Sequence, residues 1–163
     1  MERGGDIGYT SSPMITTIAS AYRETPLGLL RVTATDRGVD SIAFVDVMES
    51  SHDPISPVLR RCLQELDAYF SGNLQHFSVP LVQRATDFQQ SVWDAITQIP
   101  YGFTVTYRGI AERIGTPDAA RAVGTAVGSN PIMIIVPCHR VVPSTGGVGA
   151  YAFGTEKKEW LLS

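Results

Sequence analysis

The first third of the chain alternates short apolar runs with turn-forming residues. Period-two alternation bounded by Gly, Pro and Asp is typical of antiparallel strands joined by tight turns. From residue 16 onward the pattern therefore predicts a three-stranded antiparallel meander. Its strands are residues 18–22, 29–34 and 41–45, and its turns are Pro26-Leu27-Gly28 and Asp36-Arg37-Gly38.

A different period follows the predicted strands. Leu59, Leu63, Leu66 and Phe70 recur at the spacing of one helix face, and Ser71-Gly72-Asn73 is a stop signal. We expect this helix to back the small sheet. Cys62 stands beside the apolar stripe and is interpreted as a packing residue, since free cysteine is among the most buried residue types.

The second half begins with another helical pattern, in which Thr86-Asp87 offers an N-cap and Pro100-Tyr101-Gly102 ends the helix. Two short helices over residues 106–114 and 118–127, joined at Gly115-Thr116-Pro117, have the outline of a helix-turn-helix. The second of them is built mostly of Ala, Gly and Val. Small residues suit either a tightly packed core helix or a helix that lies close to nucleic acid, and Arg121 slightly favours the second.

The apolar run at residues 132–136 predicts a buried strand that delivers Cys138 and His139 to a glycine-rich loop at residues 144–154. A cysteine beside a histidine can be a nucleophile, because the thiolate is the reactive form. A small buried hydrophobe is the equally weighted alternative. Neighbours in a strand point to opposite sides, so His139 would reach the Cys138 sulfur only through a bent backbone or a bridging water. Residues 155–163 predict a short, capped final helix.

Composition places the chain among ordinary globular proteins, with 44% hydrophobic and 18% charged residues. The 163 residues form one large domain or two small ones. We divide them into a flexible arm (1–14), an N-terminal α/β domain (15–82) and a C-terminal helix-turn-helix domain (83–163). No apolar stretch approaches a membrane span and no secretion signal opens the chain, so we expect a cytoplasmic protein, or a nuclear one in a eukaryote. Two cysteines in unlike contexts also favour a reducing compartment.

Charge weighs mildly against a nucleic-acid partner. Residues 1–85 carry seven Arg and ten acidic residues, a net −3, and residues 86–163 carry four Arg and two Lys against six acidic residues, a net zero. A tight non-specific DNA binder is usually strongly basic. A local surface matters more than the sum, however, so the composition does not exclude DNA.

The second half closely resembles the O6-alkylguanine-DNA alkyltransferases (methylated-DNA–protein-cysteine methyltransferases). Pro137-Cys138-His139-Arg140-Val141 is highly specific for that family. The first half matches more loosely, through the Thr25-Pro26-Leu27-Gly28 turn and the order of strands and helix. The other matching motifs are Ile99-Pro100-Tyr101-Gly102, Thr106-Tyr107, Ala120-Arg121-Ala122-Val123-Gly124, Asn130-Pro131, Gly149-Ala150-Tyr151 and Lys158-Glu159-Trp160-Leu161-Leu162.

The resemblance implies an α+β fold: a small antiparallel sheet with a helix, like the family's ribonuclease-H-like domain, followed by a mostly helical domain with a helix-turn-helix and an active-site loop. It implies irreversible transfer of an alkyl group from O6 of guanine, or O4 of thymine, to Cys138, once per molecule. No metal or cofactor is needed. The expected partner is double-stranded DNA with O6-alkylguanine, approached from the minor groove by a monomer.

The same resemblance assigns roles to individual residues. His139 would act as base through a water, Asn130 would order the turn behind the thiol, and Tyr107 would contact the phosphate and the leaving guanine. Arg121 would replace the extruded base in the stack. The other DNA-binding residues would be Thr106, Ala119, Ala120, Ala122 and Gly124, and the guanine pocket would be formed by Val141, Val148, Gly149, Tyr151, Ala152 and Phe153.

Two departures from the family set further expectations. The family's glutamate, a few residues after Trp-Leu-Leu, hydrogen-bonds the histidine, but this sequence stops at Ser163, and Glu156 and Glu159 stand too early to match it. Either the chain is shortened, another acid replaces the glutamate, or transfer is slow. Phe153 stands where the family commonly has a small residue, so we expect O6-benzylguanine to be a poor substrate.

Two other classes of function are weighed against the alkyltransferase. A non-catalytic sensor of alkylguanine would fit the missing glutamate, but proteins of that kind replace the reactive cysteine, which this chain keeps. A Cys–His hydrolase would need a triad acid near the motif, and it leaves Arg121 unexplained.

Overall fold

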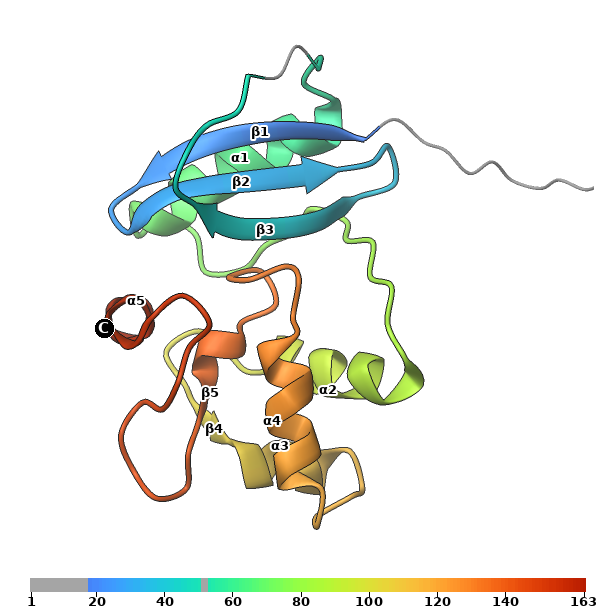
Figure 1. Cartoon of the computed structure of the whole chain (residues 1–163), viewed down its shortest axis with the longest axis vertical. Coiled ribbons are helices and arrows are strands. Elements are labelled where there is room, and N and C mark those ends of the chain that lie inside the picture. The colour runs from blue at the N-terminus through green and yellow to red at the C-terminus, as the bar shows by residue number, and fades with distance from the viewer. Residues whose placement is uncertain (1–17, 51–52) are drawn as a thin grey trace, which may run out of the picture.

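The structure is a computed structural model that describes residues 18–50 and 53–163. The arm predicted for residues 1–14 lies outside this range. Figure 1 shows a sheet with one helix in the upper half and a mostly helical lower half, as the sequence predicted. No helix in the described part of the chain is long and apolar enough to cross a membrane.

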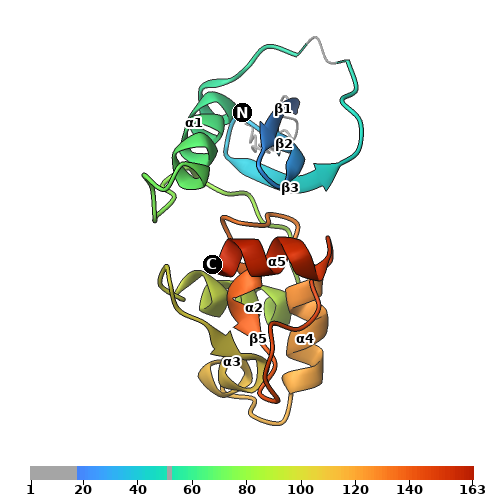
Figure 2. The same ribbon diagram turned by 90° about the vertical axis from the view of Figure 1, so that its left-hand side faces the viewer.

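The predicted meander is confirmed as β1 (Ala19–Thr25), β2 (Gly28–Ala34) and β3 (Val39–Val45), paired antiparallel in that order. Gly28 supports the β1–β2 turn with a φ of 129°, a value that residues with a side chain rarely adopt. Helix α1 (Pro57–Phe70) lies along one face of the sheet (Figure 2). Its buried residues Leu59, Cys62, Leu63, Leu66 and Tyr69 join the core, so the packing interpretation of Cys62 is confirmed.

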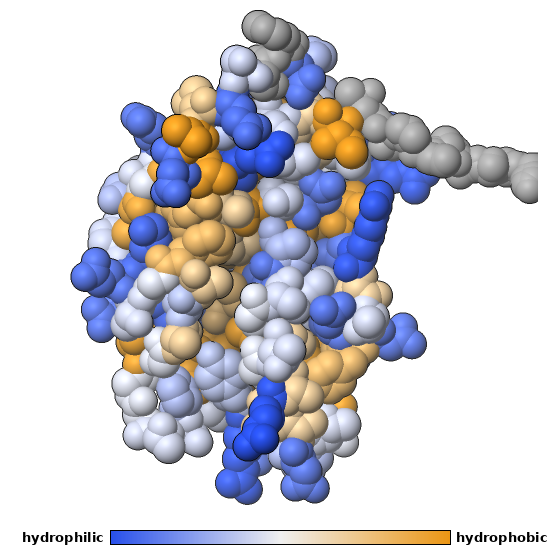
Figure 3. Space-filling view, in the orientation of Figure 1, coloured by the Kyte–Doolittle hydropathy of each residue, from blue (hydrophilic) through white to orange (hydrophobic). Residues whose placement is uncertain are grey.

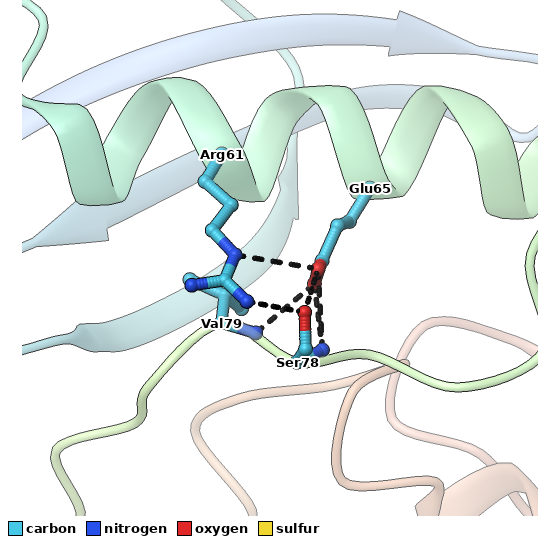
Figure 4. A network of polar contacts seen from close by, with 4 residues as sticks. All are labelled: Arg61, Glu65, Ser78 and Val79. Atoms are coloured by element: carbon cyan, nitrogen blue, oxygen red, sulfur yellow. Dashed lines mark hydrogen bonds and ion pairs between the residues drawn. The ribbon is translucent and has the colours of Figure 1, made fainter.

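A polar network holds the connector after α1 against that helix (Figure 4). The Glu65 carboxylate accepts hydrogen bonds from the backbone amides of Ser78 (2.8 Å) and Val79 (3.0 Å) and from the Ser78 hydroxyl (2.8 Å). Arg61 donates to the same hydroxyl at 2.6 Å. These bonds satisfy the backbone amides of Ser78 and Val79, which take part in no strand or helix. They therefore fix the path of the connector toward the C-terminal half.

The lower half is formed by α2 (Asp87–Thr97), α3 (Tyr107–Arg113), α4 (Ala120–Gly128) and α5 (Thr155–Leu162). Thr86 caps α2 through a full capping box with Gln89. Helices α3 and α4 form the predicted helix-turn-helix. The N-cap of α5 is Gly154, without a side-chain cap bond, so the expectation of a capped start was wrong for this helix. A short parallel pair, β4 (Val105–Thr106) with β5 (Val141–Val142), joins the segment before α3 to the segment that follows Arg140.

The strand predicted at residues 132–136 is wrong. Apart from an isolated bridge between Ile132 and Ile42, the segment is a series of turns, in which the Val136 amide bonds the Ile132 carbonyl. Ile134 has a φ of 72°, an uncommon backbone conformation for a β-branched residue. Apolar composition alone does not separate a buried turn from a buried strand, because both put every side chain in the core.

The two halves contact each other through backbone and rings. The Ile42 amide in β3 donates to the Pro131 carbonyl at 2.9 Å. Phe70 of α1 lies 5.7 Å from Trp160 of α5, and Phe44 of β3 lies 5.5 Å from Phe153, both measured between ring centroids. The sheet is therefore in direct contact with the segments that carry the candidate site.

Candidate active site

A pocket of about 360 Å³ opens between α3, α4, the turns after Asn130 and the glycine-rich loop. Cys138 lies in its wall, so the nucleophile predicted from the sequence faces a space that could hold a ligand. The eleven lining residues are Tyr107, Gly124, Val127, Gly128, Asn130, Met133, Cys138, Ala150, Tyr151, Ala152 and Phe153.

Cys138 begins a one-turn 3-10 helix (Cys138–Arg140), and 9% of its surface is exposed. Burial raises the pKa of its thiol above the ordinary value, whereas the Asn130 side chain and the Lys158 ammonium act in the opposite direction. The backbone amides of Cys138 and His139 also favour the thiolate. The surroundings thus keep the resting thiol protonated but supply groups that can stabilise the anion once it forms.

His139 is buried, with 1% of its surface exposed, and it is not among the residues that line the pocket. Burial, with smaller contributions from Arg140 and Lys158, lowers the pKa of its imidazole to about 3. The ring is therefore neutral at pH 7, and the same burial and cations oppose its protonation. Within the described residues neither ring nitrogen has a hydrogen-bond partner. The extended geometry expected for this motif is corrected to a 3-10 turn, in which adjacent side chains still point in different directions.

Asn130 ties the turns behind the thiol together. Its Nδ2 donates to the Val136 carbonyl at 2.8 Å, and its Oδ1 accepts from the Ile132 amide at 3.0 Å. Since Val136 in turn accepts from the Cys138 amide at 2.7 Å, one side chain connects both ends of the turn segment to the nucleophile. The amide of Asn is well suited to such bridging of turn backbone.

Tyr107 begins α3 and forms the opposite wall of the pocket. Burial, and the nearby Cys138, raise the pKa of its hydroxyl, so Tyr107 stays protonated and can donate a hydrogen bond. A Cβ built on Gly124 of α4 would lie 3.8 Å from the Tyr107 ring, an ordinary van der Waals distance, so α4 packs directly beside the ring. Thr106 caps α3 by accepting from the Gly109 amide at 2.9 Å, which fixes where Tyr107 starts the helix.

The glycine-rich loop supplies the last wall. Of the pocket residues predicted from the sequence, Tyr151, Ala152 and Phe153 line it, and Val141, Val148 and Gly149 do not. Val141 is fully buried behind the 3-10 turn. Gly149 has a φ of 78°, and a Cβ there would lie 2.8 Å from the Pro143 ring, so close packing of the loop on itself requires glycine.

Lys158 is a site residue that sequence reasoning missed. Only 1% of its surface is exposed, and its Nζ donates to the carbonyls of Val141 (2.8 Å) and Ala150 (3.2 Å). It therefore joins the segment after the nucleophile to the pocket loop. Its position inside a mostly polar terminal helix gave no sign of burial. The pocket has four other lining residues that the sequence did not single out. Val127, Gly128 and Met133 have the pattern of core or helix-end positions, and Ala150 stands within the predicted pocket loop.

The predicted DNA-binding residues cluster on the helix-turn-helix. Arg121 and Ala122 are exposed on α4, and Ala119, Ala120 and Gly124 are half-buried. Hydrophilic side chains stand beside hydrophobic ones at the lower end of the molecule, where α3 and α4 lie (Figure 3). Within the described residues no group of three or more His, Cys, Asp or Glu side chains could hold a metal ion.

Comparison with known proteins identifies the family. Residues 87–163 match the model of the 6-O-methylguanine DNA methyltransferase DNA binding domain, and residues 18–83 match its ribonuclease-like domain. A methylated-DNA–protein-cysteine methyltransferase of Methanosarcina acetivorans is 43% identical over 147 residues, which cover 87% of this chain and 94% of that one. One of Mycolicibacterium paratuberculosis is 42% identical over 144 residues, or 86% and 87% of the two chains.

Solved structures of the same family have the same fold as this chain. The crystal structure of the Mycobacterium tuberculosis O6-methylguanine methyltransferase superposes with a TM-score of 0.81 at 39% identity, covering 90% of this chain and 91% of that one. The Mycobacterium tuberculosis OGT in complex with DNA superposes with a TM-score of 0.79 at 42% identity, covering 86% and 88%. The resemblance seen in the motifs is confirmed over both halves: the chain belongs to the 6-O-methylguanine DNA methyltransferase family.

Proposed function

We propose that this protein repairs DNA by transferring an alkyl group from O6 of guanine to the sulfur of Cys138, as a methylated-DNA–protein-cysteine methyltransferase. The observation that carries the proposal is Cys138 in the wall of a 360 Å³ pocket, in a chain whose relatives bear that name over nearly their whole length. Those names favour a transferase over a non-catalytic alkylguanine sensor.

The chemistry needs a thiolate, an acceptor for the thiol proton and a donor for the leaving guanine. Neutral His139 takes the proton through a bridging water, because its ring does not line the pocket. The sulfur then attacks the alkyl carbon on O6, forming the S–C bond as the C–O bond breaks. The electron pair of that bond passes to the guanine, which receives a proton from the Tyr107 hydroxyl. The proton taken up by His139 then returns through water to the Tyr107 oxygen, so the thiol proton ends on the guanine and Tyr107 and His139 are both neutral again. The thioether on Cys138 is stable, so each molecule acts once.

Burial and nearby charges surround the His139 ring. In the described part of the chain no carboxylate bonds its ring, and Glu156 and Glu159 are both exposed. We propose that tight packing fixes the orientation of the imidazole, while burial and the cations of Arg140 and Lys158 keep it neutral.

For the DNA interface we propose that α4 enters the minor groove with its small residues and that Arg121 fills the space of the extruded base. The target atom is unreachable inside a duplex, so the nucleotide must leave the stack. Arg121 is exposed among Ala and Gly, which allows the helix backbone to approach the bases. The predictions of a monomer and of a cytoplasmic or nuclear location stay predictions.

Replacing Arg121 by alanine is expected to slow transfer from duplex DNA about tenfold or more, because unstacking a base costs a few kcal/mol that nothing then offsets. Transfer from a single-stranded oligonucleotide with the same lesion is expected to fall much less, since its base needs no extrusion. Single-turnover rates on both substrates measure this. Arg60→Ala, an exposed arginine on α1, is the control. Equal losses on both substrates would contradict the role.

The proposed function is tested by the intact mass of the protein after incubation with duplex DNA that contains O6-methylguanine. We expect a gain of one methyl group, located on Cys138 by peptide mapping, and a lesion restored to guanine. Binding of the DNA with no gain in mass would instead support a sensor. Methylation of Cys62 would contradict the assignment of the nucleophile.

A further inference from the structure

One residue that lines the pocket, Phe153, stands on a loop with little regular structure. Its surface is 37% exposed. It stands directly before Gly154, whose φ is 106°, and it follows Gly146, Gly147 and Gly149, which also have positive φ values. Glycine at these positions permits the loop path but does not hold it, because glycine is the least restrained residue in the backbone.

A ring on the N-terminal sheet contacts Phe153. Phe44 of β3 and Phe153 lie 5.5 Å apart between centroids, with an interplanar angle of 68°, and Phe153 and Tyr151 lie 6.2 Å apart at 67°. Both are edge-to-face arrangements, which aromatic rings prefer. Phe44, Phe153 and Tyr151 thus form a continuous row of rings from the sheet into the pocket.

Phe44 is itself firmly held. It pairs with Leu30 in the ladder between β2 and β3. Its ring lies over Gly28, where an added Cβ would be 3.7 Å away, and the Lys157 ammonium lies 5.2 Å from the ring centroid. A cation over a ring face adds to the attraction. The sheet therefore offers a paired and packed ring against which the end of the glycine-rich loop rests.

We propose that Phe44, although it lies in the N-terminal domain, is a specificity-determining residue that holds Phe153 in the pocket wall and so limits the size of the alkyl group that enters the pocket. The inference rests on the proposed alkyl transfer. The ribonuclease-like domain thus takes part in substrate selection. It acts through its contact with the pocket loop and does not touch the substrate.

The test compares single-turnover rates on two duplexes that differ only in carrying O6-methylguanine or O6-benzylguanine. For Phe44→Leu we expect benzyl transfer to accelerate about three- to tenfold, the size of an aromatic pair's contribution, with methyl transfer nearly unchanged. Phe153→Leu should give a similar gain from the other side of the contact. The double variant should exceed neither single variant, since both remove the same interaction. Phe77→Leu, which loses a ring contact with Tyr69 away from the pocket, is the matched control and should leave the ratio of the two rates unchanged.

A purely structural role for Phe44 would lower both rates together along with the melting temperature, and that result would overturn the proposal. An unchanged ratio in Phe44→Leu, or gains that add in the double variant, would overturn it as well. Failure of the proposed function is distinguishable, because the wild-type protein would then accept no methyl group from the first duplex.

Discussion

Replacing Cys138 by serine is expected to reduce methyl transfer to background while leaving the binding of alkylated DNA unchanged. A serine hydroxyl is a much poorer nucleophile near neutral pH than a thiol, and the groups around Cys138 favour a thiolate but cannot ionise an alcohol. Serine occupies nearly the same volume, and the bonds of Asn130 to Val136 and Ile132 do not involve the sulfur. The pocket should therefore keep its shape. Intact mass reports transfer, and a gel-shift titration reports binding.

Cys62→Ser is the matched control, because it makes the same atomic change at the other cysteine. Cys62 is fully buried on α1, and burial, with a smaller contribution from Glu65, raises the pKa of its thiol to about 12. We expect full methyl transfer but a loss of about 1–3 kcal/mol in the free energy of unfolding, since an unpaired hydroxyl replaces an apolar contact. Urea denaturation measures that loss. Methyl transfer by Cys138→Ser, or its absence in Cys62→Ser, would refute the assignment.

The parts of the fold that follow from local pattern were predictable. The meander alternates with period two and has Gly28 where the turn needs an unusual φ, and α1 repeats leucine at helical spacing. The helix-turn-helix carries its own turn signal at Gly115, whose φ is 81°. In each of these cases neighbours in sequence decide the structure, so a single sequence contains the necessary information.

The parts that depend on distant contacts were not predictable from pattern. Residues 132–136 form turns because Asn130 bonds both ends of the segment and β3 contacts its start. The apolar composition of the segment gives no sign of either contact. Arg140 and Lys158 are both buried cations whose donors find carbonyls far along the chain: Arg140 bonds Ile99, and Lys158 bonds Val141. A charged residue is expected at the surface until such partners are known.

Lys158 is consequently the residue for which the structure changes the expectations most. Its ammonium is held by two carbonyls, one directly after the nucleophile's turn and one in the pocket loop, and it lies 6.0 Å from the Tyr107 ring centroid. The positive charge lowers the pKa of the Cys138 thiol, against the larger effect of burial. Burial lowers the pKa of Lys158 itself, while Cys138 acts in the opposite direction. One side chain thus combines a structural clamp with electrostatic support for the thiolate.

Lys158→Met keeps most of the volume but removes the charge and both hydrogen bonds. We expect the free energy of unfolding to fall by about 2–3 kcal/mol, because two carbonyls lose their donor. We also expect methyl transfer at pH 7 to slow about tenfold or more, because the thiolate loses the ammonium that lowers its pKa. Removing a positive charge raises the thiol pKa, so the rate should keep rising to higher pH than in the wild type. Arg37→Met, at an exposed position on the sheet domain, controls for net charge. A pH–rate profile separates the two roles of Lys158. If the variant's rate recovers at high pH, the lysine acts by lowering the thiol pKa. If the rate stays below that of the wild type by a constant factor, the lysine acts by holding the two backbone segments together. An unchanged rate at every pH would contradict both.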